Sequence, residues 1–223
     1  MSAGMTADRH GTAATAEAPG AARPGGAGVR ELGVAGAFEF TPTVFPDDRG
    51  LFVDSFRLAA FEEAVGHPFP VVQTSQSRSR RGVVRGVHYT ATPPGMAKFV
   101  HCTGGRALDF VVDLRVGSPT FGSWDSVVLG GEELRSVYVP VGVGHAFVAL
   151  EDATTMVYLM SGGYVPANEL AVSPLDPDLA LPYDQGVAPL LSERDRAAPT
   201  LAQAVRLGLL PDYRTSLALD RAL

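Results

Sequence analysis

The chain has 223 residues, a formal net charge of −6 and a pI near 5.3, with 46% hydrophobic and 19% charged residues. This profile is typical of a soluble globular protein of one large or two small domains. The acidic balance argues against a nucleic-acid partner, and no apolar run reaches the roughly 20 residues of a membrane span. Cys102 is the single cysteine, which excludes an intramolecular disulfide and fits a reducing cytoplasm.

Residues 1–28 are rich in Ala and Gly and contain no aromatic residue. Such a segment buries too little surface to offset its ordering entropy, so we predict a disordered tail. It lacks the apolar stretch of a secretory signal. Residues 29–223 are predicted to form a single domain.

Short runs of Val, Leu, Phe and Tyr follow, interrupted by Gly, Pro, Asp and Ser. They predict strands at residues 36–45, 50–56, 71–77, 82–90, 97–102, 107–115, 124–129, 136–140, 145–150 and 154–160. Many short strands at this spacing indicate an all-β sandwich or barrel. Helical spacing predicts a helix at 58–65, and capping signals predict a turn from Ser192 to Asp195 and a helix at 201–207.

Alternation along residues 107–115 separates two faces. Asp109, Asp113 and Arg115 share one face, opposite four apolar side chains. Such a polar face lines a polar cavity or meets solvent, and strand statistics favour solvent.

Gly86 lies between Arg85 and His88, which a regular strand would place on opposite faces. A glycine inside a strand often marks a bulge, which would turn both side chains into one cavity. That cavity would be cationic and would suit an anionic ligand such as a diphosphate. The alternative is a solvated arginine loop at residues 78–81 and a structural core histidine.

Lys98 is the single lysine beside 17 arginines. One explanation is that this position requires a compact ammonium with a tunable pKa, which arginine lacks. The other is chance, because a single lysine in the chain has to occur at some position. The spacing of Pro140, Gly142 and His145 resembles half of a cupin metal motif, but His88 lacks the second histidine and nearby glutamate that complete it, so we predict no catalytic metal. No phosphate-binding or dinucleotide-binding glycine loop is present.

The combined motifs resemble the dTDP-4-dehydrorhamnose 3,5-epimerase family. They are Asp-Arg-Gly-x-Phe at 48–52, Gln-x-Ser-x-Ser at 73–77, Arg-Gly-Val-Val-Arg-Gly-Val-His-Tyr at 81–89, Ala-Lys-Phe-Val at 97–100, the segment 108–122, Pro-x-Gly-x-x-His at 140–145, Tyr158, Tyr164, Asp-Pro at 176–177 and Ser-x-x-Asp at 192–195. The resemblance covers roughly residues 34–200.

The resemblance implies a cupin-type jelly-roll β-barrel with a few short peripheral helices. It also implies a homodimer that exchanges edge strands, no metal or organic cofactor, and a dTDP-4-keto-6-deoxyhexose as substrate. By position, the implied catalytic residues are His88 (base), Asp195 (its partner), Lys98 (facing the enolate oxygen), Tyr158 (acid on the opposite face) and Asp109. The implied substrate-binding residues are Arg49, Phe52, Asp54, Gln73, Arg85, His145, Tyr164 and Arg194, with Phe52 reaching in from the partner.

These residue types suit the reaction. A C–H beside a ketone needs a base at the proton and a cation at the oxygen, and inversion needs an acid on the other face. Three readings stay open: an epimerase acting at C3, C5 or both, a cupin sugar-nucleotide ketoisomerase, and a non-catalytic sugar-nucleotide-binding module. The chain departs from the family pattern at Asp54 (usually Glu), Ser75 (usually Asn), Arg194 (usually Lys) and the segment 181–183.

Overall fold

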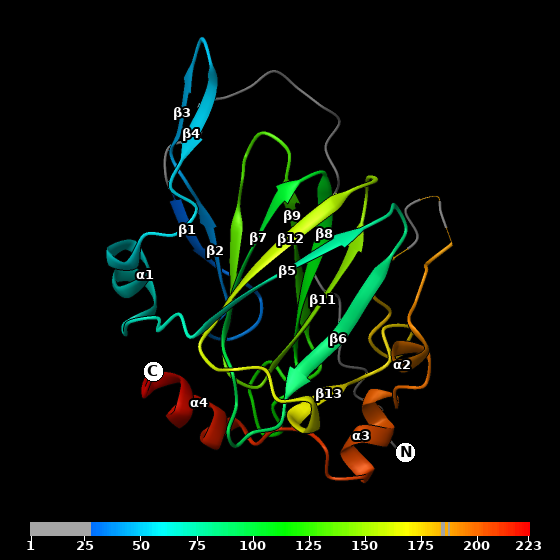
Figure 1. The fold of residues 1–223 in the computed structure, drawn as a ribbon. Coiled ribbons are helices and arrows are strands. Elements are labelled where there is room, and N and C mark those ends of the chain that lie inside the picture. The colour runs from blue at the N-terminus through cyan, green and yellow to red at the C-terminus, as the bar shows by residue number, and fades with distance from the viewer. Residues whose placement is uncertain (1–27, 184–185, 187) are drawn as a thin grey trace, which may run out of the picture.

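A computed structural model describes residues 28–183, 186 and 188–223. Two large antiparallel sheets face each other, one with strand order β1-β2-β10-β7-β12-β5 and the other with order β13-β6-β11-β8-β9 (Figure 1). A separate hairpin, β3–β4, projects from one end. The predicted jelly-roll class is therefore confirmed, although the sheets form an open sandwich and do not close into a barrel.

The strands are β1 Gly28–Glu31, β2 Phe38–Thr41, β3 Val44–Asp47, β4 Gly50–Val53, β5 Gln73–Ser79, β6 Val84–Thr90, β7 Lys98–Gly104, β8 Arg106–Asp113, β9 Trp124–Gly130, β10 Ser136–Val139, β11 Val143–Ala149, β12 Thr154–Met160 and β13 Glu169–Ala171. The helices are α1 Leu58–Val65, α2 Glu193–Arg196, α3 Leu201–Arg206 and α4 Tyr213–Arg221, with a 3-10 turn at Pro166–Asn168.

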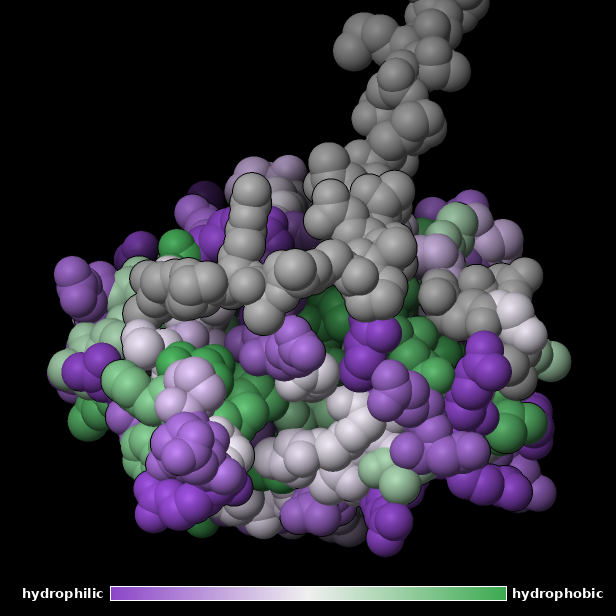
Figure 2. All heavy atoms as spheres, turned by 90° about the horizontal axis from the view of Figure 1, so that it is seen from above, coloured by the Kyte–Doolittle hydropathy of each residue, from purple (hydrophilic) through white to green (hydrophobic). Residues whose placement is uncertain are grey.

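Three apolar clusters hold the layers together. One fills the space between the sheets and includes Val100, Val111 and Phe147. A second covers the outer face of the five-stranded sheet, where Leu201 of α3 packs. The third covers the outer face of the six-stranded sheet, where the Phe61 ring of α1 meets Tyr138 edge-on at 4.8 Å. On the face seen from above, hydrophobic side chains show near the centre, and much of the rim is hydrophilic (Figure 2).

The sequence prediction placed one strand at 36–45, whereas the structure has β2 and β3 there. Pro42 lies between them and lacks the N–H that a continuing ladder needs. The prediction also missed β1, β13 and α4. The predicted disordered tail lies outside the described residues except for Gly28, which begins β1.

The expectation that Asp109, Asp113 and Arg115 face solvent is wrong. All three are at most 2% exposed. β8 is covered on both faces, so its polar face points into the sandwich and not into water. Arg115 donates from Nε to Asp113 Oδ1 at 2.9 Å and from Nη2 to Ala35 O at 2.8 Å, which pairs the buried charges.

In the described part of the chain, no helix is long and apolar enough to cross a membrane.

Candidate active site

The ladders place polar side chains from both sheets in the space between them. On β11, His145 lies on the same face as Phe147 of the inner core, and it pairs directly with His88 of β6. On β12, Tyr158 packs against the same inner core from the opposite sheet. His88 and Tyr158 therefore project from facing walls of the sandwich.

The predicted bulge is present in β6. His88 pairs with His145 and Arg85 pairs with Phe147, so three steps along β6 match two along β11. Gly86 takes a φ of +135°, a conformation that glycine adopts readily. The bulge brings Arg85 and His88 onto the same face, and Arg85 Nε donates to Ser79 Oγ at 3.2 Å.

His88 is paired with Asp195 of α2. Ser192 caps this short helix by accepting from the Asp195 backbone N–H at 3.1 Å, which fixes the carboxylate in place. His88 Nε2 lies 2.7 Å from Asp195 Oδ1. Burial opposes ionisation of Asp195, but the hydrogen bond and charge of His88, with Ser192 and Arg194, outweigh it and lower the pKa of this carboxyl. An ionised Asp195 makes Nε2 the donor, so the neutral ring carries its lone pair on Nδ1.

The Tyr158 side chain has a contact at its ring and another at its hydroxyl. Its ring stands edge-on to His145, with centroids 6.0 Å apart. Its hydroxyl is 3.2 Å from Ser77 Oγ on β5. Burial raises the pKa of Tyr158 to about 12, so the group is a protonated acid at neutral pH.

Asp109 and His145 form a second, fully buried carboxylate–imidazole pair. Asp109 Oδ2 is 2.6 Å from His145 Nε2. Burial raises the pKa of Asp109, partly offset by His145. Its second oxygen is buried and has no hydrogen-bond partner among the residues that the structure describes.

Lys98 is a buried side chain on the inner face of β7, in register with Met160. Burial lowers the pKa of its ammonium, while the charge of Glu169 raises it and that of Arg194 lowers it. Glu169 of β13 accepts from Thr90 Oγ1 at 3.2 Å, and Arg194 Nη2 donates to the Glu169 carbonyl at 2.9 Å. Sequence reasoning missed Glu169, because it sits in a three-residue strand that no pattern predicted.

Gln73 and Tyr164 lie together at the margin of this group. The Tyr164 backbone N–H donates to Gln73 Oε1 at 2.9 Å, and Gln73 Nε2 donates to Ser75 Oγ at 3.0 Å. The Tyr164 side chain is 53% exposed and free to contact a ligand.

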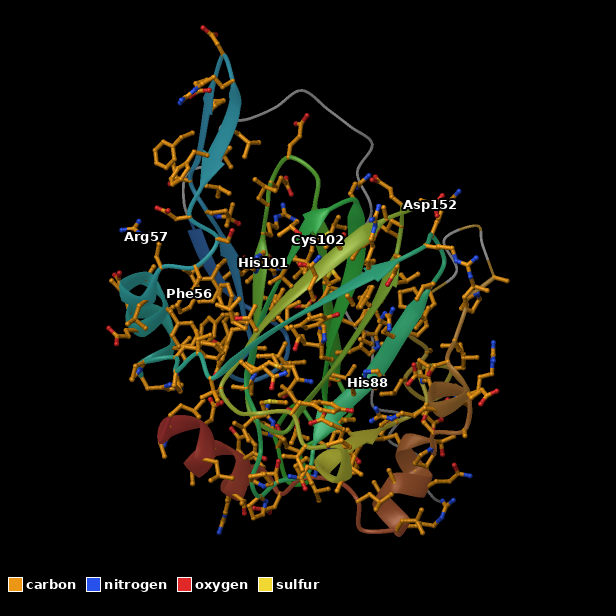
Figure 3. All side chains as sticks on the ribbon, in the orientation of Figure 1. Phe56, Arg57, His88, His101, Cys102 and Asp152 are labelled. Carbon is orange, nitrogen blue, oxygen red and sulfur yellow. The ribbon has the colours of Figure 1, made fainter. Side chains whose placement is uncertain are left out.

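Arg49, Phe52 and Asp54 are not brought to this group within the single chain. Arg49 and Phe52 belong to the projecting hairpin, where Phe52 is 63% exposed and Arg49 pairs with Asp47. Asp54 and Phe56 line a separate cavity of about 350 Å³ beside α1. Figure 3 shows His88 toward the opposite end of the molecule, near β13 and α2.

The arrangement supplies groups that can accept and give protons from the two facing sheets. An imidazole backed by a carboxylate lies on one wall, a protonated phenol on the other, and a buried ammonium beside them. No group of three or more His, Cys, Asp or Glu side chains in the described ranges is placed to hold a metal ion.

Comparison with known families identifies the fold's relatives. The profile of the dTDP-4-dehydrorhamnose 3,5-epimerase family matches residues 31–203, most of the chain. The chain belongs to this family. Members of this epimerase family are isomerases, which confirms the family and enzyme class expected from the sequence motifs.

Curated relatives within the epimerase family include enzymes with two reaction names. A dTDP-4-dehydro-6-deoxyglucose 3-epimerase from Streptomyces bikiniensis is 50% identical, over 82% of this chain and 93% of that protein. A dTDP-4-dehydrorhamnose 3,5-epimerase from Streptomyces griseus is 47% identical, over 87% of this chain and 97% of that protein. The two identities are too similar to separate the two activities.

Solved structures of epimerases in this family share the fold. NovW, a 4-keto-6-deoxy sugar epimerase of the novobiocin cluster of Streptomyces spheroides, is 46% identical with a TM-score of 0.85, covering 89% of this chain and all of NovW. A double mutant of a 3'-monoepimerase from Streptomyces bikiniensis, in complex with dTDP, is 47% identical with a TM-score of 0.83, covering 86% of this chain and 96% of that one. In that mutant a histidine becomes asparagine and a tyrosine becomes phenylalanine, 70 positions apart, the same separation as His88 and Tyr158 here.

Proposed function

We propose that the protein inverts C3, C5 or both in a dTDP-4-keto-6-deoxyhexose, by proton abstraction through an enolate, in deoxysugar biosynthesis. The observation that carries the proposal is the placement of His88 and Tyr158 on facing sheets, each with its own hydrogen-bond partner. The 70-position separation shared with the replaced pair of the Streptomyces bikiniensis enzyme supports it.

The reaction needs one base and one acid. Nδ1 of His88 takes the proton from the carbon beside the C4 ketone, and the electron pair of that C–H bond forms the enolate. The Lys98 ammonium stabilises the negative oxygen, and ionised Asp195 stabilises the imidazolium. Tyr158 then gives its phenolic proton to the other face of the carbon. Water removes the proton from His88 and returns one to Tyr158, so the cycle balances without a cofactor.

The other residues of the site are proposed to bind and orient the substrate. Arg85 and Arg194 supply positive charge for the diphosphate, and Gln73 and Tyr164 hold the nucleotide at the margin. Asp109 is proposed to fix the His145 imidazole against the Tyr158 ring, and His145 to contact the sugar. Binding energy from the nucleotide then positions the reacting ring.

We also propose a homodimer in which the β3–β4 hairpin of one subunit carries Arg49 and Phe52, with Asp54 directly after it, toward the site of the other. Three apolar side chains of the hairpin, Phe45, Leu51 and Phe52, are 54–63% exposed in the single chain, and a partner surface would cover them. The enzyme would meet its nucleotide-sugar substrate in the cytoplasm.

Proton NMR in D₂O tests the function. Incubation with the dTDP-4-keto-6-deoxyhexose should place deuterium at C3, C5 or both, with inversion; labelling of one carbon identifies a mono-epimerase. His88→Ala should lower the rate about 10²–10⁴-fold while dTDP binding persists. A moved carbonyl would instead indicate a ketoisomerase, and tight binding without any deuterium uptake a binding module; either result overturns the proposal.

A further inference from the structure

The inward face of β5 carries a row of short polar side chains along the site. β5 is the edge strand of the six-stranded sheet and pairs with β12 over its full length. Gln73, Ser75, Ser77 and Ser79 share its inward face because they pair with inward residues of β12, Met156 among them. Their hydrogen bonds reach different parts of the site: Gln73 holds the Tyr164 backbone, Ser77 the Tyr158 hydroxyl and Ser79 the Arg85 guanidinium.

Ser77 is hydrogen-bonded to the hydroxyl of Tyr158, the acid of the proposed reaction. Tyr158 lies directly opposite Ser75 in the ladder, yet its hydroxyl lies against Ser77, one inward position along the strand. Such a diagonal is within reach of a long aromatic side chain. The ring is fixed by its edge-on contact with His145 and by the inner core, so the Ser77 contact sets the direction of the hydroxyl.

The direction of that hydrogen bond follows from the chemistry. When Tyr158 gives its proton to the sugar carbon, its O–H bond points at the ring. The phenolic oxygen can then only accept from Ser77, whose hydroxyl must be the donor. After transfer, the same hydrogen bond meets a phenolate, and hydrogen bonds to charged groups are stronger than those between neutral groups.

We infer that Ser77 is a positioning residue for the acid step: it aims the Tyr158 proton at the ring and stabilises the phenolate left behind. The inference rests on the proposed function. Burial works against the phenolate, since it raises the pKa of Tyr158 to about 12, and the Ser77 hydrogen bond acts in the opposite direction. Among the described residues, the Ser77 hydroxyl is hydrogen-bonded to Tyr158 and the His88 imidazole to Asp195, so we expect the base step not to depend on Ser77.

This separation gives a signature that general damage to the fold would not produce. In D₂O, His88 can remove a proton and return a deuteron to the same face, which labels the substrate without inverting it. Inversion needs Tyr158 as well. Removing the Ser77 hydroxyl should therefore lower inversion more than exchange.

The experiment measures both rates by proton NMR in D₂O for the full chain and its variants. Ser77→Ala should lower the ratio of inversion to exchange with retention by roughly tenfold to hundredfold, with little change in KM. Ser77→Thr keeps the hydroxyl and should restore most of the ratio. Tyr158→Phe gives the limiting case, exchange without inversion. Gln76→Ala, an exposed outward neighbour on the same strand, should behave like the wild type.

Two results would overturn the inference while the proposed function stands: a Ser77→Ala variant with the wild-type ratio, or one that loses exchange and inversion in equal proportion. A Ser77→Thr variant no better than Ser77→Ala would also contradict it. Absence of any exchange with the wild-type protein would overturn the proposed function, and the inference with it.

Discussion

Lys98 is a cation whose charge depends on its neighbours. It is buried between the sheets, and burial lowers the pKa of its ammonium. Glu169 opposes this effect and keeps the ammonium protonated to higher pH. If the ammonium stabilises the enolate oxygen, activity must fall as the pH rises through the lowered pKa of Lys98. The Tyr158 phenol, with a pKa near 12, still holds its proton in that range.

The alkaline limb of the pH–rate profile should therefore lie below 10.5, the ordinary lysine pKa. Glu169→Gln keeps the oxygen that accepts from Thr90 but removes the charge that raises the Lys98 pKa, so its alkaline limb should move to lower pH. The measurement is kcat against pH, with Glu62→Gln on the far helix α1 as a control of equal charge change. An alkaline limb at the same pH in Glu169→Gln and wild type would contradict this role for Glu169.

At the residue scale, the sequence drew attention to residues with an unusual type or an unusual spacing. For the single lysine and for the Arg85–Gly86–His88 spacing, the sequence left a functional and a bland interpretation open, and the structure places these side chains on inner faces. Glu169 has neither property. It enters the site only because β13 pairs with β6, a long-range contact that no local pattern records.

At the element scale, the bulge in β6 depends on one glycine. A Cβ on Gly86 would lie 2.3 Å from the Ala146 Cβ, and its φ of +135° is unfavourable for any other residue. The bulge decides whether Arg85 and His88 face the same way. Replacing this glycine should therefore cost both stability and activity.

Gly50 offers a matched control, because it has the same φ of +135° and nothing within 4 Å of its Cβ position. Since no described group of its own chain meets that position, Gly50→Ala should lower the free energy of unfolding by about 1–3 kcal/mol through backbone strain within the chain. Gly86→Ala should lower it by at least about 2 kcal/mol more, because neighbouring backbone must also move. Chemical denaturation measures both, and equal losses would show that the close contact has no energetic weight.

Faces and polar helices were harder to predict than the bulge. Alternation showed that Asp109, Asp113 and Arg115 share a face. It did not show that this face is buried, because the sequence of a strand that is covered on both faces does not tell its inner face from its outer face. Helix α4 escaped prediction because polar contacts hold it. Asp220 accepts from the Tyr138 hydroxyl at 2.8 Å and from the Val141 N–H at 2.9 Å, and hydrophobic spacing does not detect such anchors.

At the scale of the whole molecule, the β3–β4 hairpin is unsupported in a single chain. It projects beyond both sheets (Figure 1), and its Phe45–Phe52 ring pair, 6.4 Å between centroids, is exposed. A two-stranded hairpin is marginally stable in water on its own. Three of the residues expected to bind substrate lie on the hairpin or just after it, far from His88. The proposed exchange of hairpins would cover the exposed rings and bring the hairpin residues to a site. Each site would then combine the two sheets of one subunit, here called the body, with the hairpin of the other.

Mixing two inactive variants tests this arrangement. His88→Ala disables the body, and Arg49→Ala combined with Phe52→Ala disables the hairpin. In a mixed dimer, the intact hairpin of the His88→Ala subunit would serve the intact body of the other, giving one working site. An equal mixture after co-refolding should thus regain about a quarter of wild-type activity, since half of the dimers are mixed and half of their sites work. Mixing His88→Ala with Tyr158→Phe, two body variants, should give no recovery. Mixed dimers that form, as seen by native mass spectrometry, but stay inactive would show that each hairpin does not serve the partner's site.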